Sequence, residues 1–217
     1  QVVRLLSETE VTEDGRFHAY RNVTSLPRPV QVPHPPVWQA AFSTEQSFEE
    51  AGRKGYYVMG IPLAGERMKD LMAIYREAWQ AAGHPGEAKM MLSFAMFCAP
   101  TEDQAVAVAR PCLNGYLKAM LDAAGTWTDG IKSADYPGYD RMFAALKLES
   151  FETQREKGIA WVGTPNQIGD MIADYIATVG SFEIASLQVN FHDMPLDSAK
   201  SSMRLFAEQV MPRIRED

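Results

Sequence analysis

The sequence predicts an α/β protein with a parallel sheet. Short, almost wholly apolar runs alternate four times with longer segments in which apolar residues recur at helical spacing. Such alternation is typical of parallel strands joined by helices that cover the sheet. Two architectures fit: an open doubly wound sheet, or part of a (β/α)8 barrel. Four strands alone cannot close a barrel, which takes about 250 residues.

Composition and charge narrow the classes of function. The formal net charge of -7 over 217 residues argues against non-specific binding of nucleic acid or anionic membranes. Cys98 and Cys112 lack metal-ligand or CxxC spacing, so we expect reduced, buried thiols in a cytoplasmic protein, and no metal site. No window approaches the roughly 18 apolar residues of a membrane span, and we expect no signal peptide.

Residues 1–36 are predicted to form a lead-in to the sheet. QVVRLLSETEV reads like the tail of an amphipathic helix, so we expect an earlier part of the protein to be missing from this chain. The Asp-Gly pair in EDGRFHAYRNV predicts a small hairpin. Five prolines within residues 27–36 exclude both a helix and a central strand, so this stretch should be an extended connector.

Three strand–helix units are predicted within residues 37–124. The strands are expected at residues 37–41, 56–61 and 89–99, the first of them buried and the third covered on both faces. Ser43 or Thr44 should begin the first helix, and Gly55 should end it. The second helix is predicted at residues 67–82 and the third from residue 101 onward. Pro111 should kink or split that third helix.

The remainder of the chain is predicted to hold an irregular insert and one more strand. The insert spans residues 125–160, and residues 161–217 complete a single domain of 1–217. Thr164 is the expected N-cap of a helix that has Pro165 at its first position and ends at Gly180. The fourth strand is expected at residues 184–191, and the last helix at residues 196–210.

The junction after the first predicted strand is the candidate site. Ser43, Thr44 and Ser47 stand at a helix start that follows the strand end Ala41-Phe42. A helix N-terminus with N–H groups and hydroxyls is a ready phosphate site, and α/β folds bind ligands at the carboxyl ends of their strands. The same hydroxyls could instead simply cap the helix. The side chains at the strand end could either pack in the core or line the ligand site.

Several stretches together resemble the bacterial luciferase-like monooxygenases. They are PRPVQVPHPPVW with the S/T-x-x-S and AGRKGYY that follow it, GTPNQIGDMIADYI, the closing LFAEQVMPRIR, and the hairpin TEDGRFHAY. The resemblance covers nearly the whole chain. It implies the C-terminal half of a (β/α)8 TIM barrel, strands five to eight, with an insert after the third strand of this chain. Strands one to four have no counterpart here.

The resemblance also implies a cofactor and a reaction. Members bind FMN, or the deazaflavin F420, and hydroxyls in the S/T-x-x-S position contact the flavin phosphate. Here these are Thr44 and Ser47, with Ser43 beside them and Phe42 and Ala41 near the flavin. The implied activity is monooxygenation, in which reduced flavin and O2 oxygenate a small organic substrate. The alternatives are an F420-dependent oxidoreductase and a non-catalytic partner subunit.

The resemblance and the fold suggest further candidate residues and partners. Trp127, Tyr136, Tyr139 and Phe143 of the insert either line a substrate pocket or anchor a long loop. His192 closely follows the final strand, where catalytic residues of barrels are found, and is therefore the candidate catalytic residue. We expect a homo-oligomer, such as a dimer, or pairing with the missing N-terminal half.

Overall fold

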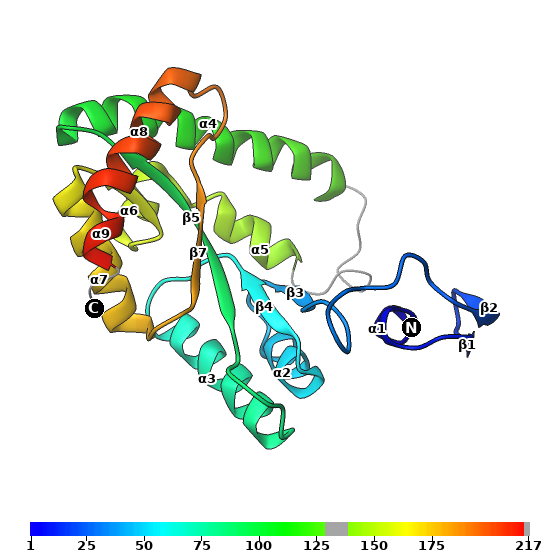
Figure 1. Cartoon of the computed structure of the whole chain (residues 1–217). Coiled ribbons are helices and arrows are strands. Elements are labelled where there is room, and N and C mark those ends of the chain that lie inside the picture. Colours follow the sequence, from blue (N-terminus) through cyan, green and yellow to red (C-terminus); the bar gives the residue numbers. More distant parts are fainter. Residues whose placement is uncertain (129–138, 215–217) are drawn as a thin grey trace. The chain divides into compact units, whose positions relative to one another are not determined.

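The computed structural model describes residues 1–128 and 139–214 and divides into two compact units, residues 1–39 and 40–217. The first unit contains helix α1 (Val2–Ser7) and an antiparallel hairpin of β1 (Val11–Asp14) and β2 (Ala19–Val23), which confirms the predicted hairpin (Figure 1). The proline-rich stretch after β2 forms neither helix nor strand, as predicted. Arg28 ties it to α1 by donating hydrogen bonds to the carbonyl oxygens of Leu5, Leu6 and Glu8, at 2.9–3.0 Å.

The second unit is built on a five-stranded sheet, which confirms the predicted α/β class. Its strands are β3 (Trp38–Ala41), β4 (Tyr57–Gly60), β5 (Met90–Cys98), β6 (Ala160–Gly163) and β7 (Ile184–Gln188). The sheet runs in the order β3-β4-β5-β6, and β7 also pairs with β5. The pairings of β5 with β4, β6 and β7 are all parallel.

Strand β5 is the centre of the sheet. Met91 is paired with Met59 of β4 and with Ile184 of β7, so these two strands lie along opposite edges of β5. Ala95 is paired with Ala160 of β6 and with Gln188 of β7. Strand β6 therefore lies on the same edge of β5 as β4, farther toward the carboxyl end. The four predicted strands thus follow one another in sequential order, β3-β4-β5-β7, and β6 is an addition.

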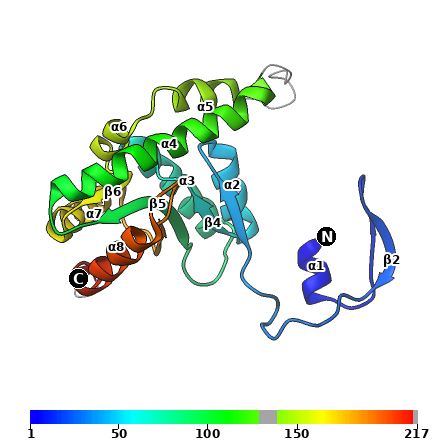
Figure 2. The ribbon, with the colours of Figure 1, turned by 90° about the horizontal axis from the view of Figure 1, so that it is seen from above.

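Helices follow most of the strands. They are α2 (Glu45–Lys54), α3 (Glu66–Ala81), α4 (Glu102–Thr128), α5 (Tyr139–Leu146), α6 (Phe151–Glu156), α7 (Pro165–Val179), α8 (Leu196–Gln209) and α9 (Met211–Ile214). Helices α2 and α3 pack closely on each other beside β4 (Figure 1). Both α4 and α8 pack on β5, which passes between them in Figure 2.

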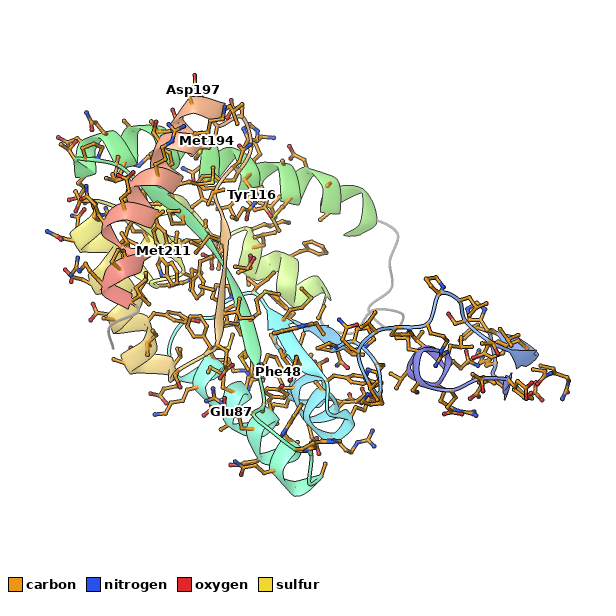
Figure 3. The ribbon with its side chains drawn as sticks, viewed as in Figure 1. Phe48, Glu87, Tyr116, Met194, Asp197 and Met211 are labelled. Carbon is orange, nitrogen blue, oxygen red and sulfur yellow. The ribbon has the colours of Figure 1, made fainter. Side chains whose placement is uncertain are left out.

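The main core lies between one face of the sheet and helices α2, α3 and α7. Alternate residues of β5, among them Met90, Leu92 and Phe94, point into it and are fully buried. The Phe94 ring stacks on Trp161 of β6, with the ring centroids 3.9 Å apart. Phe48 of α2, labelled in Figure 3, is likewise buried in this core. Burial of such large side chains contributes roughly 1.5–3 kcal/mol each.

A second core closes the carboxyl end of β5. Phe97 of β5 and Val162 of β6 join buried residues of α4 and Phe151 of α6. Tyr116 of α4 and Met194, in the loop after β7, belong to the same cluster (Figure 3). The loop after the last strand is therefore held against α4.

The opposite face of the sheet is open along the first half of β5, which corrects one prediction there, whereas Phe97 of the same face is buried in the second core. The apolar composition of β5 indicated a strand covered on both faces, but Ser93 is exposed and Met91 only half-buried. Likewise β3 is not a buried strand, because only Ala41 of its four residues is buried. We call this open side, reached by Met59, Met91, Ser93 and their paired neighbours, the inner face.

Three further predictions about local structure were wrong. Among the described residues of the predicted irregular insert, 139–160 contain the regular helices α5 and α6, and α6 begins with a capping box at Ser150 and Thr153. Strand β6 was missed, although its four residues are all buried. Pro111 does not split its helix, which was one of the two predicted outcomes: α4 continues through it, because packing of its apolar side on β5 and β6 compensates for the lost backbone hydrogen bond.

Candidate functional site

A hollow opens on the inner face at the carboxyl ends of β3 and β4. It has a volume of about 420 Å3, within the range typical of small-molecule sites. The lining residues are Ala40, Ala41, Phe42, Met59, Gly60, Ile61, Met91, Ser93 and Ser186. Carboxyl ends of parallel strands are where α/β proteins bind their ligands. Of the predicted site residues, the structure brings Ala41 and Phe42 to this hollow.

The predicted hydroxyls lie next to the hollow, at the start of α2. Thr44 is the N-cap residue, with extended backbone, but its side chain makes no capping hydrogen bond. Its hydroxyl instead lies 2.7 Å from the hydroxyl of Ser47. Ser43 sits between the hollow residue Phe42 and this cap. The Ser47 N–H donates to the Thr44 carbonyl at 3.1 Å. The N–H groups before it at this helix start lack intrahelical acceptors, so this end presents backbone donors beside two hydroxyls.

Helix α7, unlike α2, begins with a threonine whose hydroxyl caps the helix. Its N-cap Thr164 accepts a hydrogen bond from the backbone N–H of Gln167, while the Gln167 side chain accepts one from the Thr164 N–H at 2.9 Å. That reciprocal pair is the capping box that the sequence predicted. Two threonines with the same position at a helix start thus use their hydroxyls differently.

A guanidinium group lies at the same helix start, which the sequence analysis missed. Arg67, in the first turn of α3, donates one hydrogen bond to the backbone carbonyl of Ser43 at 2.9 Å. It donates another to the Glu45 carboxylate at 2.8 Å. In the sequence, Arg67 is visible only as a basic residue at the start of the helix after the second strand. Its contact with α2 could not be predicted, because that contact depends on how α2 packs on α3.

Most of the predicted aromatic wall lies outside the described residues. Tyr136 belongs to the segment that is not described, and the side chains of Trp127 and Tyr139 also fall outside the description. Phe143, on α5, is half-buried. The substrate-wall assignment of these four residues therefore stays a prediction.

His192 stands in a constrained position after β7. Its backbone is left-handed, with φ at 55°, which is uncommon for a residue other than glycine. The ring Nδ1 lies 2.7 Å from the carboxylate of Asp193, and this hydrogen bond holds the pKa of Asp193 below its ordinary value. The ring packs on the backbone of α4 at Gly115, where a Cβ atom would come within 2.8 Å of Nδ1. His192 is not among the residues that line the hollow.

The described residues offer neither a metal centre nor a membrane-spanning helix. No three His, Cys, Asp or Glu side chains gather there in a way that could hold a metal ion. No helix in the described ranges is long and apolar enough to span a bilayer. Cys98 and Cys112 are both free and buried, as predicted.

The second unit is therefore an α/β protein with a parallel sheet and a hollow of ligand size at the ends of β3 and β4. The chain belongs to the luciferase-like monooxygenase family, whose sequence profile matches residues 1–181. The family resemblance inferred from the sequence is thereby confirmed.

Relatives within and around this family include enzymes of known structure or function. A flavin-dependent trigonelline monooxygenase, oxygenase component, from Acinetobacter baylyi is 23% identical over 220 residues, which cover 99% of this chain and 58% of that protein. The crystal structure of monooxygenase RslO1 from Streptomyces bottropensis has a TM-score of 0.73 and 30% identity, covering 98% of this chain and 58% of that one. The chain thus spans less than two thirds of these relatives.

A more distant structure shares the fold. It is the oxygenating constituent of 3,6-diketocamphane monooxygenase from Pseudomonas putida, in complex with FMN. Its TM-score is 0.69 at 18% identity, covering 96% of this chain and 59% of that chain. An F420-dependent secondary alcohol dehydrogenase also shares it, with a TM-score of 0.64 at 15% identity over 95% of this chain and 57% of that one.

Proposed function

We propose that this chain forms part of a flavin-dependent monooxygenase and that the N-terminus of α2 anchors the phosphate of the flavin. The observation that carries the proposal is the helix start itself, where the N-cap hydroxyl of Thr44 does not cap the helix but faces Ser47 at 2.7 Å. Family membership supports a flavin cofactor. One relative of this chain is named as a flavin-dependent monooxygenase and another as a monooxygenase.

The residues present suit a phosphate group. Backbone N–H groups and the positive end of the helix dipole favour an anion, and two hydroxyls add further donors. The guanidinium of Arg67 adds a positive charge and keeps the Glu45 carboxylate engaged. Without that pairing, the carboxylate at the same helix start would repel a phosphate. Thr44, Ser47 and the first-turn N–H groups would hold the phosphate, and Arg67 would offset its charge.

The flavin, when bound, would supply the redox chemistry with O2, while this chain supplies binding and position. The phosphate anchor follows the hollow directly along the chain, since Ser43 comes after the lining residue Phe42, so an anchored cofactor would extend toward the inner face. Ala41 and Phe42 would then contact the cofactor or lie next to it. With a cofactor in place, this mainly apolar lining would help to exclude water from that side of the site.

We further propose that the sheet is half of a barrel. The sequential order β3-β4-β5-β7 and the open inner face both suit strands five to eight of a (β/α)8 barrel. The remaining strands would come from a preceding segment or a second polypeptide. By analogy with the trigonelline relative, named as an oxygenase component, a separate protein would deliver reduced flavin. F420 carries a phosphate as well and remains the alternative cofactor.

Two variants, one at the start of α7 and one at the start of α2, together test the phosphate anchor. Thr164→Ala removes a hydroxyl that caps its helix, so it should lower the free energy of unfolding by about 1 kcal/mol and leave FMN affinity unchanged. The double variant Thr44→Ala/Ser47→Ala should change stability less and weaken FMN binding by roughly tenfold or more, because hydrogen bonds to a charged group contribute about 1.5–3 kcal/mol.

Calorimetric titration with FMN and with F420, together with urea unfolding, measures both effects in the 217-residue chain. FMN affinity that is the same in the double variant and the wild type would refute the anchor. A chain that binds neither cofactor but self-associates in sedimentation would instead support the partner-subunit alternative.

A further inference from the structure

The loop that joins β4 to α3, residues 61–65, is tied to the main core by a hydrogen bond. The Tyr175 hydroxyl of α7 donates to the backbone carbonyl of Leu63 at 2.9 Å, across 112 positions of the chain. Tyr175 is only 4% exposed, and a phenol buried to that extent needs an acceptor for its O–H group. The bond therefore satisfies the phenol and, at the same time, holds the loop at one point.

The Tyr175 ring is held by other aromatic rings rather than by the loop. It meets Phe94 of β5 edge to face, with the ring centroids 5.1 Å apart, and it meets Phe182 in the same way at 6.2 Å. Both arrangements are favourable for aromatic pairs. Since packing in the core fixes the ring, the hydroxyl is a fixed point to which the loop is bound.

The same loop leads directly to the guanidinium group at the start of α2. Residues 64–66 alone separate Leu63 from Arg67 in the chain. Arg67 donates hydrogen bonds to the carbonyl oxygen of Ser43 at 2.9 Å and to the Glu45 carboxylate at 2.8 Å. One end of this short stretch is thus bound to α7 and the other end to α2.

The backbone of that stretch contains a conformation that favours glycine. Gly65, the N-cap residue of α3, has φ at 62° and ψ at -147°, which residues with a side chain rarely adopt. Space is not the reason, because no atom beyond its chain neighbours lies within 4 Å of the position that a Cβ atom would take. The route from Leu63 to Arg67 therefore depends on a specific backbone geometry.

We infer that Tyr175 is a positioning residue for the phosphate anchor. Its hydroxyl fixes the loop 61–65, and the loop sets the Arg67 guanidinium beside the start of α2. The inference rests on the proposed function, because it takes α2 as the helix that receives the flavin phosphate. In this role Tyr175 acts on the cofactor through Arg67, without contacting it.

A second buried tyrosine provides the matched control. Tyr75 of α3 is fully buried in the same core, and its hydroxyl donates to the carbonyl oxygens of Tyr56 at 3.2 Å and Lys89 at 3.0 Å. Tyr56 and Lys89 directly precede β4 and β5, so these carbonyls lie at the amino ends of the strands, whereas Leu63 follows β4. Tyr75→Phe and Tyr175→Phe thus remove the same group at opposite ends of the sheet.

Calorimetric titration with FMN and riboflavin, together with urea unfolding, tests the inference in the 217-residue chain. Both variants should lower the urea midpoint, because each removes a hydrogen bond from the core. Only Tyr175→Phe should also weaken FMN binding, by roughly 2–4-fold, the range expected for a displaced charge at a helix N-terminus. Riboflavin binding, which does not involve the phosphate, should stay unchanged. FMN binding that weakens equally in both variants would overturn the inference, as would equal weakening of FMN and riboflavin in Tyr175→Phe.

A double-mutant cycle tests whether Tyr175 acts through Arg67. Arg67→Gln alone should weaken FMN binding at least as much as Tyr175→Phe alone. The combined variant should bind FMN no more weakly than Arg67→Gln, because the loop then has no guanidinium left to place. Fully additive losses would contradict a route through Arg67.

Gly65 offers a second test that leaves the tyrosine intact. Gly65→Ala should weaken FMN binding by roughly 2–5-fold and leave riboflavin binding unchanged, because alanine strains the backbone that leads to Arg67. Gly83→Ala is the control, because Gly83 has φ at 71°, equally open surroundings and a place beyond the far end of α3. Both substitutions should lower the urea midpoint, but Gly83→Ala should leave FMN affinity unchanged. Equal FMN affinity in Gly65→Ala and the wild type would count against the inference.

The wild-type affinities separate this inference from the proposed function. An FMN affinity no greater than that for riboflavin would refute the phosphate anchor and, with it, any residue that positions it. A wild-type preference for FMN that is lost in Thr44→Ala/Ser47→Ala but kept in full in Tyr175→Phe would leave the anchor standing and overturn the role of Tyr175. A preference that falls in both of these variants, and not in Tyr75→Phe, supports the anchor and the positioning together.

Discussion

The hydroxyl groups of Thr44 and Ser47 lie 2.7 Å apart across the first turn of α2, and the Thr44 side chain does not cap the helix. Helix capping by threonine normally satisfies a backbone N–H of the first turn. At α2 the two side chains instead satisfy each other. A ligand phosphate can replace that mutual contact with stronger, charge-assisted hydrogen bonds.

Arg67→Gln should weaken FMN binding without a large change in stability. The substitution releases the Glu45 carboxylate at the anchor and removes a positive charge, so we expect a loss of roughly 2–5-fold, the usual effect of an exposed charge at a helix N-terminus. Arg110→Gln is the matched control, because Arg110 of α4 pairs with Glu152 of α6 at 2.7 Å in a similarly exposed ion pair. Calorimetry should find no change in that control. A larger effect of Arg110→Gln would contradict the role of Arg67.

Gly52→Ala should destabilise the protein, although alanine is the better helix former. A Cβ atom at Gly52 of α2 would overlap the backbone carbonyl oxygen of Tyr75 on α3 and come within 2.9 Å of the Trp79 backbone nitrogen. Overpacking of this kind costs about 1–3 kcal/mol. Gly125→Ala in α4 meets nothing within 4 Å and should be neutral or stabilising by up to about 1 kcal/mol. Urea midpoints compare the two, and equal shifts would refute the close contact of α2 with α3.

Alkaline pH should unfold the protein through two buried phenols. Burial raises the pKa of both Tyr75 and Tyr175, whose hydroxyls donate to backbone carbonyls such as those of Lys89 and Leu63. The folded state therefore keeps protons that the unfolded state releases near pH 10. Stability is complete below that pH and falls as pH rises above it.

Phenolate absorbance and circular dichroism, followed together, check this expectation. A fraction of the phenolate signal should appear only as the helical signal is lost. The double variant Tyr75→Phe/Tyr175→Phe should show a shallower loss of stability with pH. Complete phenolate formation before unfolding would contradict the burial of these two groups.

The thiol of Cys98 should be almost unreactive in the folded protein. Burial raises its pKa from about 9 to about 11, which leaves roughly a hundredfold less thiolate near pH 8. Burial, with a smaller effect of Asp193, raises the pKa of Cys112 too. A disulfide reagent should therefore label both cysteines only after unfolding. Rapid labelling of the native chain at pH 8, located by mass spectrometry, would contradict this.

Local signals in the sequence predicted some elements because their causes are local. The capping box at Thr164, the proline at the next position and Gly180 lie within one helix, and the structure contains all three features as predicted. The left-handed Gly55 that ends α2 is another such case. Strand β6 was missed because four buried residues before a helix cap look the same in sequence as the end of a loop.

The open inner face could not be read from composition. Methionine and alanine on β5 suggested that both faces are covered, yet only the pairing of β5 with β4 and β7 reveals which residues share a face. The contact of Arg67 with α2 and the hollow between four strands likewise depend on tertiary packing. The candidate hydroxyls could be predicted, since they occupy a helix start after a strand. Their unusual mutual contact could not.

The most direct test of the phosphate anchor compares FMN with riboflavin, which lacks the phosphate, in the wild-type chain and in Thr44→Ala/Ser47→Ala. Calorimetry should give wild-type affinity for FMN at least about tenfold greater than for riboflavin, because only FMN can use the donors at the start of α2. In the double variant that ratio should fall toward one, with riboflavin affinity unchanged. Equal affinities for FMN and riboflavin in the wild type, or a ratio that survives in the variant, would contradict the account.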